Sequence, residues 1–234
     1  MRLFGLLAVL LLVTGVATPA EAQKRTAAGH RWVETVVRTP EGGYRQGNPN
    51  AKVKLVEYGA RTCPTCAAFA AEGVGPLREK YIKTGKVSYE FRDFMVHGAP
   101  DAAAALINQC VPVSRFFPVL DAFFAGQRPV VERLHALEED PARMEQLESL
   151  PPLEAVAGFA EALGYVEFAT QQGLTEVKAR ACLGDLALLQ GIARVQDEGE
   201  RLGVDGTPGF LINGKLVEPY TWATLEPLLI AAIG

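Results

Sequence analysis

Between Lys86 and Phe94, the hydrophobic residues Val87, Tyr89 and Phe91 alternate with the polar residues Ser88, Glu90 and Arg92. A period of two predicts a β-strand. A second β-prone run, Val53–Tyr58, precedes an Ala-rich stretch, Ala67 to Lys83, that predicts a helix. The order strand, helix, strand implies a parallel crossover between the two strands. Pro76 is expected to kink the helix rather than end it, because proline removes a hydrogen bond from the helix interior.

Turn signals predict a hairpin at each end of this core. Before the first core strand, the strand-like patch Trp32 to Val37 and the turn Glu41-Gly42-Gly43 indicate a hairpin that leads into it. Near the C-terminus, Asn213-Gly214 lies between apolar runs and predicts a hairpin with a type I′ turn. A last helix is expected from Thr221 to Ile233.

Between Pro100 and Gln190 the sequence carries almost no strand signal. The helix-like segments of this block are Ala102–Leu106, Val119–Phe124, Val130–Leu137, Leu153–Ala162 and Glu176–Leu189. Another helix, Ile192 to Leu202, follows the block. We therefore predict an α/β domain of residues 23–98 and 192–234, interrupted by an all-helical insertion domain of residues 99–191.

Composition excludes some classes of function. The chain has 234 residues, of which 49% are hydrophobic, and a net charge of −4. It is long enough to bury a sizeable core, and no basic balance points to nucleic acid. Beyond the N-terminus, no stretch of the sequence is apolar enough to span a membrane.

The N-terminus predicts a secretory signal peptide over residues 1–22. Met1-Arg2 is a short positive segment, Leu3 to Val16 is apolar, and Ala20-Glu21-Ala22 has the small-x-small cleavage pattern. The alternative is an uncleaved membrane anchor, which the short apolar run disfavours. We expect a periplasmic protein whose mature chain starts near Gln23, in a compartment where disulfides persist.

Two of the four cysteines lie at the junction between the predicted core strand and the following helix, in Cys63-Pro64-Thr65-Cys66. At the start of a helix, free N–H groups and the helix dipole favour an anion, which here is the thiolate of Cys63. Pro64 suits the first helical turn. The spacing brings Cys66 close enough for a small disulfide ring. Because a stabilised thiolate favours the reduced form, such a disulfide is oxidising.

The other two cysteines, Cys110 and Cys182, lie near the two ends of the helical block. Four cysteines allow three pairings, and spacing favours Cys63–Cys66 with Cys110–Cys182. A Cys110–Cys182 disulfide is expected to be structural and to stabilise the block by roughly 4 kcal/mol on the loop-entropy estimate. The alternative is a pair of buried free thiols.

Several motifs together resemble the thioredoxin-fold thiol–disulfide oxidoreductases, specifically the DsbA-like branch with a helical insertion. The matching motifs are Gly47-Asn48-Pro49-Asn50, Val56-Glu57-Tyr58, Cys63-Pro64-Thr65-Cys66, Gly206-Thr207-Pro208-Gly209-Phe210 and Asn213-Gly214-Lys215. They bracket the helical block where this family places it, so the resemblance covers nearly all of the predicted mature chain.

The resemblance implies a role for each matching position. Cys63 would be the more exposed thiol that attacks and leaves, and Cys66 its buried resolving partner. Pro208 would be the cis-proline beside the disulfide, and Thr207 would offer backbone contacts to an extended substrate. Glu57 would be the buried acid that exchanges a proton with Cys66. The alternative for Glu57 is an ordinary glutamate at a strand end that faces solvent.

The resemblance also implies an activity and its partners. We expect an enzyme that donates disulfides to reduced, unfolded or folding exported proteins, works without an organic cofactor, and is reoxidised by a membrane quinone-linked oxidase. We expect a monomer that binds no nucleic acid. The oxidising relatives carry Pro-His between the cysteines, whereas this chain has Pro64-Thr65, so its disulfide can be less oxidising. An isomerase or reductase is therefore the alternative, although the chain lacks room for the N-terminal dimerisation domain of the isomerases.

Three further classes of function remain as rivals. A structural zinc site is disfavoured because there is no second Cys-x-x-Cys and because His30, His97 and His135 are scattered on unrelated segments. A non-catalytic binding or chaperone module of the same fold is disfavoured by the position of both thiols at the strand–helix junction. A hydrolase lacks the nucleophile elbow.

Overall fold

The computed structural model describes residues 31–218 and 220–234. The predicted signal peptide and His30 lie outside the described residues. Trp32–Gly234 forms one compact unit, and the description below concerns this unit. Among the described residues, no helix combines the length and the apolar character needed to cross a bilayer.

The described strands form one sheet of six, in the order β1-β2-β4-β3-β5-β6. The strands are β1 (Val36–Arg38), β2 (Tyr44–Gly47), β3 (Val53–Gly59), β4 (Val87–Asp93), β5 (Gly209–Ile212) and β6 (Lys215–Val217). The two central strands, β3 and β4, pair in parallel, which confirms the predicted crossover. All other neighbours are antiparallel. Every residue of β4 is buried, as expected of a strand covered on both faces.

Both predicted hairpins are present. β1 and β2 pair beside the core, although Trp32–Glu34 is a short 3-10 turn rather than part of the strand. β5 and β6 are joined by Asn213 and Gly214, whose φ angles of 51° and 80° are the positive values that a type I′ turn requires.

The helix that follows the cysteines begins as α2 (Pro64–Phe69) and continues through wider π-helical turns, Ala70–Val74 and Leu77–Ile82. Pro76, between these two turns, has helical backbone angles. The helical path therefore passes the proline without ending, because a wide turn accommodates the missing N–H donor.

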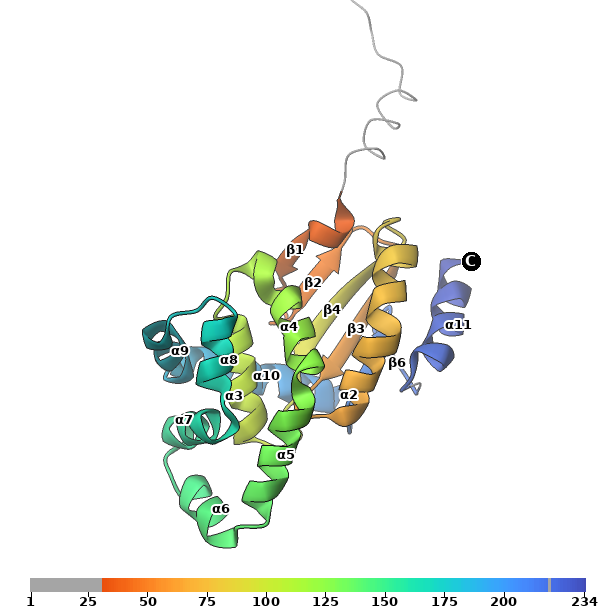
Figure 1. Cartoon of the computed structure of the whole chain (residues 1–234). Helices are drawn as coiled ribbons and strands as arrows, with labels where there is room; N and C mark the ends of the chain where they lie inside the picture. The colour runs from red at the N-terminus through yellow and green to blue at the C-terminus, as the bar shows by residue number, and fades with distance from the viewer. Residues whose placement is uncertain (1–30, 219) are drawn as a thin grey trace, which may run out of the picture. The chain divides into compact units, whose positions relative to one another are not determined.

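Helices cover both faces of the sheet (Figure 1). On one face, α2, α4 (Phe116–Ala125) and α11 (Trp222–Ile233) bury a core that includes Phe69, Phe116 and Leu225. On the other face lies α10 (Leu186–Arg201), whose Val195 packs against Tyr58 of β3. The carboxyl end of β3 thus lies inside a sandwich of helices.

The remaining helices are α3 (Ala99–Gln109), α5 (Gln127–Glu138), α6 (Pro141–Glu148), α7 (Pro152–Leu163), α8 (Tyr165–Gln171) and α9 (Glu176–Leu183). All of them except α6 contribute to a second core, which also includes Val119 and Phe123 of α4 and Ile192 of α10. Cys110, just after α3, is joined to Cys182 in α9 by a disulfide with a Cα–Cα distance of 6.1 Å. That separation lies in the ordinary range for a disulfide.

Two predicted helices have different limits in the structure. The segment expected as one helix from Glu176 to Leu189 is two helices. α9 ends at Leu183 and is followed by Gly184. Asp185 then caps the start of α10, because its side chain accepts a hydrogen bond from Leu188 N at 2.9 Å. The helix expected to start at Ile192 starts at Leu186 instead. α10 therefore runs without a break through the predicted domain boundary at residues 191 and 192. The division into two domains stays a prediction.

Candidate active site

Cys63 lies at the point where the central strand β3 gives way to α2. Its N–H donates to Ala60 O at 3.3 Å, which closes the turn after the strand. Cys63 is the N-cap of the helix, and Pro64 occupies the first helical position. The sequence predicted this placement, because a β-prone run, a proline and an Ala-rich run are local signals.

The two thiols lie in different environments. Both are free, Cys63 is 8% exposed and Cys66 is 0% exposed. A hydrogen bond from the Cys66 thiol, aided by Thr207 and by the N–H groups of Thr65 and Cys66, lowers the pKa of Cys63 to about 5 despite burial. The pKa of Cys66 is raised, first by burial and then by the hydrogen bond that its thiol donates to Cys63. The site therefore pairs a slightly exposed thiolate with a fully buried neutral thiol.

The predicted proline lies beside these sulfurs. The Thr207–Pro208 bond is cis, and the Cys63 Sγ lies 3.2 Å from Thr207 O. Pro208 leads directly into β5, which pairs with β3 through Gly209 and Tyr58. The Thr207 hydroxyl is buried and has no other hydrogen-bond partner among the described residues, so it is available to the Cys63 thiolate.

Glu57 does not face solvent. Glu57 lies on β3 and is 1% exposed. Its Oε2 accepts a 2.6 Å hydrogen bond from the hydroxyl of Tyr89 on β4. Burial raises the pKa of Glu57 to about 8. The charge of Glu57 contributes to raising the pKa of Cys66, after burial and the Cys63 hydrogen bond. The carboxyl group is thus coupled to the buried thiol.

Glu57→Gln is expected to stabilise the fold at alkaline pH. A carboxyl whose pKa rises on folding favours the folded state below about pH 4.5, and this contribution is lost as the pH rises through about 8. Glutamine keeps an acceptor for Tyr89 but does not ionise. The free energy of unfolding, measured by urea titration, should therefore rise on the order of a few kcal/mol at pH 9 and remain near the wild-type value at pH 4. Equal gains at both pH values would show that the ionisation of Glu57 is not the cause.

Sequence reasoning missed three polar residues that hold the site. Gln127, at the start of α5, donates from Nε2 to Arg61 O and Cys63 O, each at 2.8 Å. Asp101 of α3 accepts from the N–H of Thr62 at 3.2 Å and from its hydroxyl at 2.7 Å. His97 Nδ1 lies 2.7 Å from the same hydroxyl. No local pattern marks these residues, because each reaches the cysteine loop from a distant segment of the chain.

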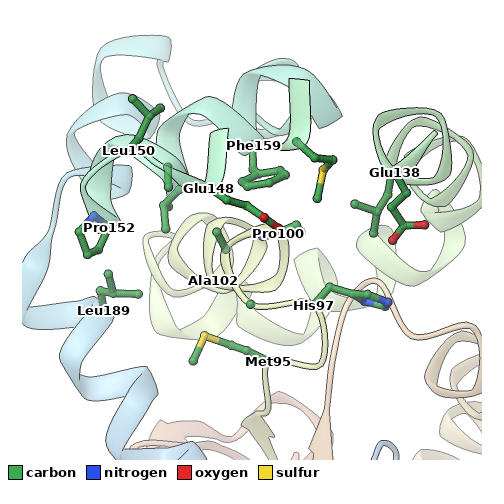
Figure 2. Close-up of a pocket in the computed structure, with 16 residues that line it drawn as sticks. Met95, His97, Pro100, Ala102, Glu138, Glu148, Leu150, Pro152, Phe159 and Leu189 are labelled. Carbon is green, nitrogen blue, oxygen red and sulfur yellow. The ribbon is translucent and has the colours of Figure 1, made fainter. Parts of the chain in front are cut away.

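A pocket with a volume of about 620 Å³ lies beside this network. Its lining is mainly apolar and includes Met95, Leu134 and Phe159. In Figure 2, His97 and Glu138 lie toward one end of the pocket, and Pro152 and Leu189 toward the other. His97 therefore lies between an apolar pocket and the residue that precedes Cys63.

The chain is similar to known thiol–disulfide oxidoreductases. The family described as thioredoxin matches residues 39–230. A Rickettsia conorii protein assigned as a protein-disulfide oxidoreductase is 33% identical over 93% of this chain and 70% of its own length. A similar Rickettsia bellii protein is 36% identical over 80% of this chain, which spans 63% of that protein.

Solved structures show the same architecture. The crystal structure of a protein-disulfide isomerase from Novosphingobium aromaticivorans superposes with a TM-score of 0.73 at 32% identity, covering 81% of this chain and 96% of that one. Wolbachia pipientis α-DsbA1 shares the fold, with a TM-score of 0.63 at 20% identity, covering 82% of this chain and 91% of that one. With two thiols placed at the end of the central strand of such a fold, the chain belongs to the thioredoxin family, as a DsbA-like thiol–disulfide oxidoreductase.

Proposed function

We propose that this enzyme introduces disulfide bonds into reduced, unfolded or folding exported proteins, with Cys63–Cys66 as its redox-active pair. The observation that carries the proposal is the contrast between the two sulfurs. Interactions at the helix start favour the thiolate of Cys63, with a pKa of about 5, while Cys66 is fully buried. Because those interactions act on the reduced enzyme, they make its disulfide a better oxidant.

The proposed reaction starts from the Cys63–Cys66 disulfide. A substrate thiolate attacks the Cys63 sulfur, the bond between the cysteines breaks, and its electron pair passes to Cys66. The Cys66 sulfur takes up a proton, for which the neutral carboxyl group of Glu57 is the nearby donor. Its raised pKa of about 8 keeps that proton available at neutral pH.

The second step releases the product. Another substrate thiolate attacks the substrate sulfur in the mixed disulfide, and Cys63 leaves as a thiolate. A thiol of low pKa is a good leaving group, so the same interactions that stabilise the anion speed this step. The backbone of Thr207, beside the cis-proline Pro208, is suited to hold the substrate chain during both steps.

The cell must reoxidise the enzyme after each cycle. We infer that a membrane quinone-linked oxidase accepts the two electrons, and that the chain works in the periplasm as a monomer after removal of residues 1–22. The predicted signal peptide and the DsbA-like architecture support this inference. The structural disulfide Cys110–Cys182 is in keeping with an oxidising compartment.

A second candidate is disulfide isomerisation. It is favoured by the similar Novosphingobium aromaticivorans structure, which bears the name of an isomerase. Threonine at position 65, where oxidising relatives carry histidine, also suits a less oxidising disulfide. Both activities use the same two thiols, and they differ in whether the resting enzyme is oxidised or reduced.

The deciding measurement is the equilibrium of the Cys63–Cys66 pair with glutathione. A reduction potential well above about −230 mV, near the biochemical glutathione poise, would support net oxidation. The oxidised enzyme should then regenerate activity of a reduced, unfolded test protein faster than the reduced enzyme rescues a scrambled one. A potential near −270 mV, that of thioredoxin, would favour a reductase or isomerase. Absence of any redox equilibrium would contradict both candidates.

A further inference from the structure

His97 belongs to a chain of hydrogen bonds that ends at the residue before Cys63. The buried Thr62 hydroxyl donates to Asp101 Oδ1 at 2.7 Å, so its lone pairs are free to accept from His97 Nδ1, also at 2.7 Å. The backbone N–H of His97 donates to Asp101 Oδ2 at 2.9 Å. These contacts fix the histidine by its backbone and its ring, and they place the proton on Nδ1.

The charges around the ring favour its cationic form. Asp101 is 3% exposed, and the distance from its Oδ2 to His97 Nδ1 is 3.7 Å. The other charged groups that act on the ring are Glu138, from α5, and the thiolate of Cys63. All three are anionic, and the hydrogen bond with Asp101 is the largest cause of the raised pKa of His97.

From this geometry we propose that His97, protonated and anchored by Thr62 and Asp101, is a positioning residue whose charge stabilises the thiolate of Cys63. The proposal rests on the proposed redox role of Cys63 and deepens it. Thr65, between the cysteines, brings no charge to the sulfur. The cation comes instead from a segment 34 positions beyond Cys63 along the chain (97 minus 63), which only the fold brings to the site.

The proposal has a direct thermodynamic consequence. If the imidazolium stabilises the thiolate, the thiolate must raise the pKa of His97 by the same amount, because coupling between two sites is reciprocal. The oxidised enzyme has no thiolate at Cys63. The pKa of His97 is therefore expected to be higher in the reduced enzyme than in the oxidised one. The side chain of His97 is 39% exposed, so solvent screens the effect and the difference is expected to be modest.

The first test uses the unmodified full chain. Its histidine ring protons are titrated by NMR in the oxidised and reduced states, and the signal of His97 is assigned from its substitution. The exposed His135 of α5 supplies the internal control, since its ring signals should not depend on the redox state. Equal pKa values for His97 in the two states would overturn the proposal.

The second test compares His97→Asn with His135→Asn. Asparagine places an amide near the Nδ1 position, so it can still donate to Thr62 without carrying a charge. At pH 6, loss of the cation should make the enzyme easier to oxidise by glutathione disulfide, by roughly threefold to tenfold in the equilibrium constant, where tenfold corresponds to about 30 mV. Near pH 9, where the imidazole is neutral, the variant and the wild type should converge. His135→Asn should match the wild type throughout.

The outcomes separate this proposal from the proposed function. If the wild type shows a redox equilibrium and His97→Asn leaves it unchanged at pH 6, the role of His97 is wrong while the redox role of Cys63 stands. If the variant is altered equally at pH 6 and pH 9, its effect is structural rather than electrostatic, and the proposal fails. If the wild type shows no redox equilibrium, the proposed function itself fails.

Discussion

Cys63→Ser is expected to abolish thiol–disulfide exchange while leaving the fold intact. The reacting atom is a thiolate, and a serine hydroxyl at this position neither ionises near neutral pH nor forms a disulfide. The loss should be on the order of a thousandfold or more, down to the rate of the uncatalysed reaction. Cys63 is 8% exposed and packs in the core beside the sheet, but serine is close to cysteine in size and shape, so the melting temperature should fall only modestly.

The matched variant is Cys66→Ser. It keeps the attacking thiol but removes the buried partner, which can break the mixed disulfide by attacking Cys63. With a test protein that has a single thiol and with an oxidant present, this variant should accumulate a covalent complex through Cys63, visible on a non-reducing gel, whereas Cys63→Ser should accumulate none. Exchange activity that survives in Cys63→Ser would show that the nucleophile is assigned wrongly.

The double variant Cys110→Ser with Cys182→Ser is expected to lose stability rather than activity. The bond joins residues 72 positions apart in the sequence and closes a loop that contains α4 to α8. On the loop-entropy estimate its removal costs about 4 kcal/mol. For a domain of this size that corresponds to a fall of roughly 8 to 16 °C in the melting temperature, measured by circular dichroism without reductant.

Its exchange activity should stay within about twofold of the wild type at temperatures where both are folded, because the two sulfurs pack outside the core that holds Cys63. The control is the wild type treated with mild reductant that opens only Cys63–Cys66. An unchanged melting temperature in the double variant would show that the disulfide does not stabilise the helices. A large loss of activity with unchanged stability would instead point to a redox role for Cys110 and Cys182.

Several features of this protein follow from the sequence alone, since they depend on neighbouring residues. A β-prone run predicted β3, strand periodicity predicted β4, and the helix signal between them predicted their parallel pairing. Asn213-Gly214 predicted the hairpin of β5 and β6 because few residues adopt positive φ. The limits of α9 and α10 were predicted less well, because Gly184 and Asp185 form a short break inside a run of similar helical pattern.

The chemistry of the site depended on the tertiary structure. Whether Glu57 faces solvent or the core could not be decided from its strand position, because burial of both faces of β3 is decided by helices from elsewhere in the chain. His97, Asp101 and Gln127 had no signal in the sequence, since a single polar residue in a loop or helix is common. The sequence by itself thus determined the strand–helix junction and its two cysteines. The charges and donors that control their reactivity were decided by long-range packing.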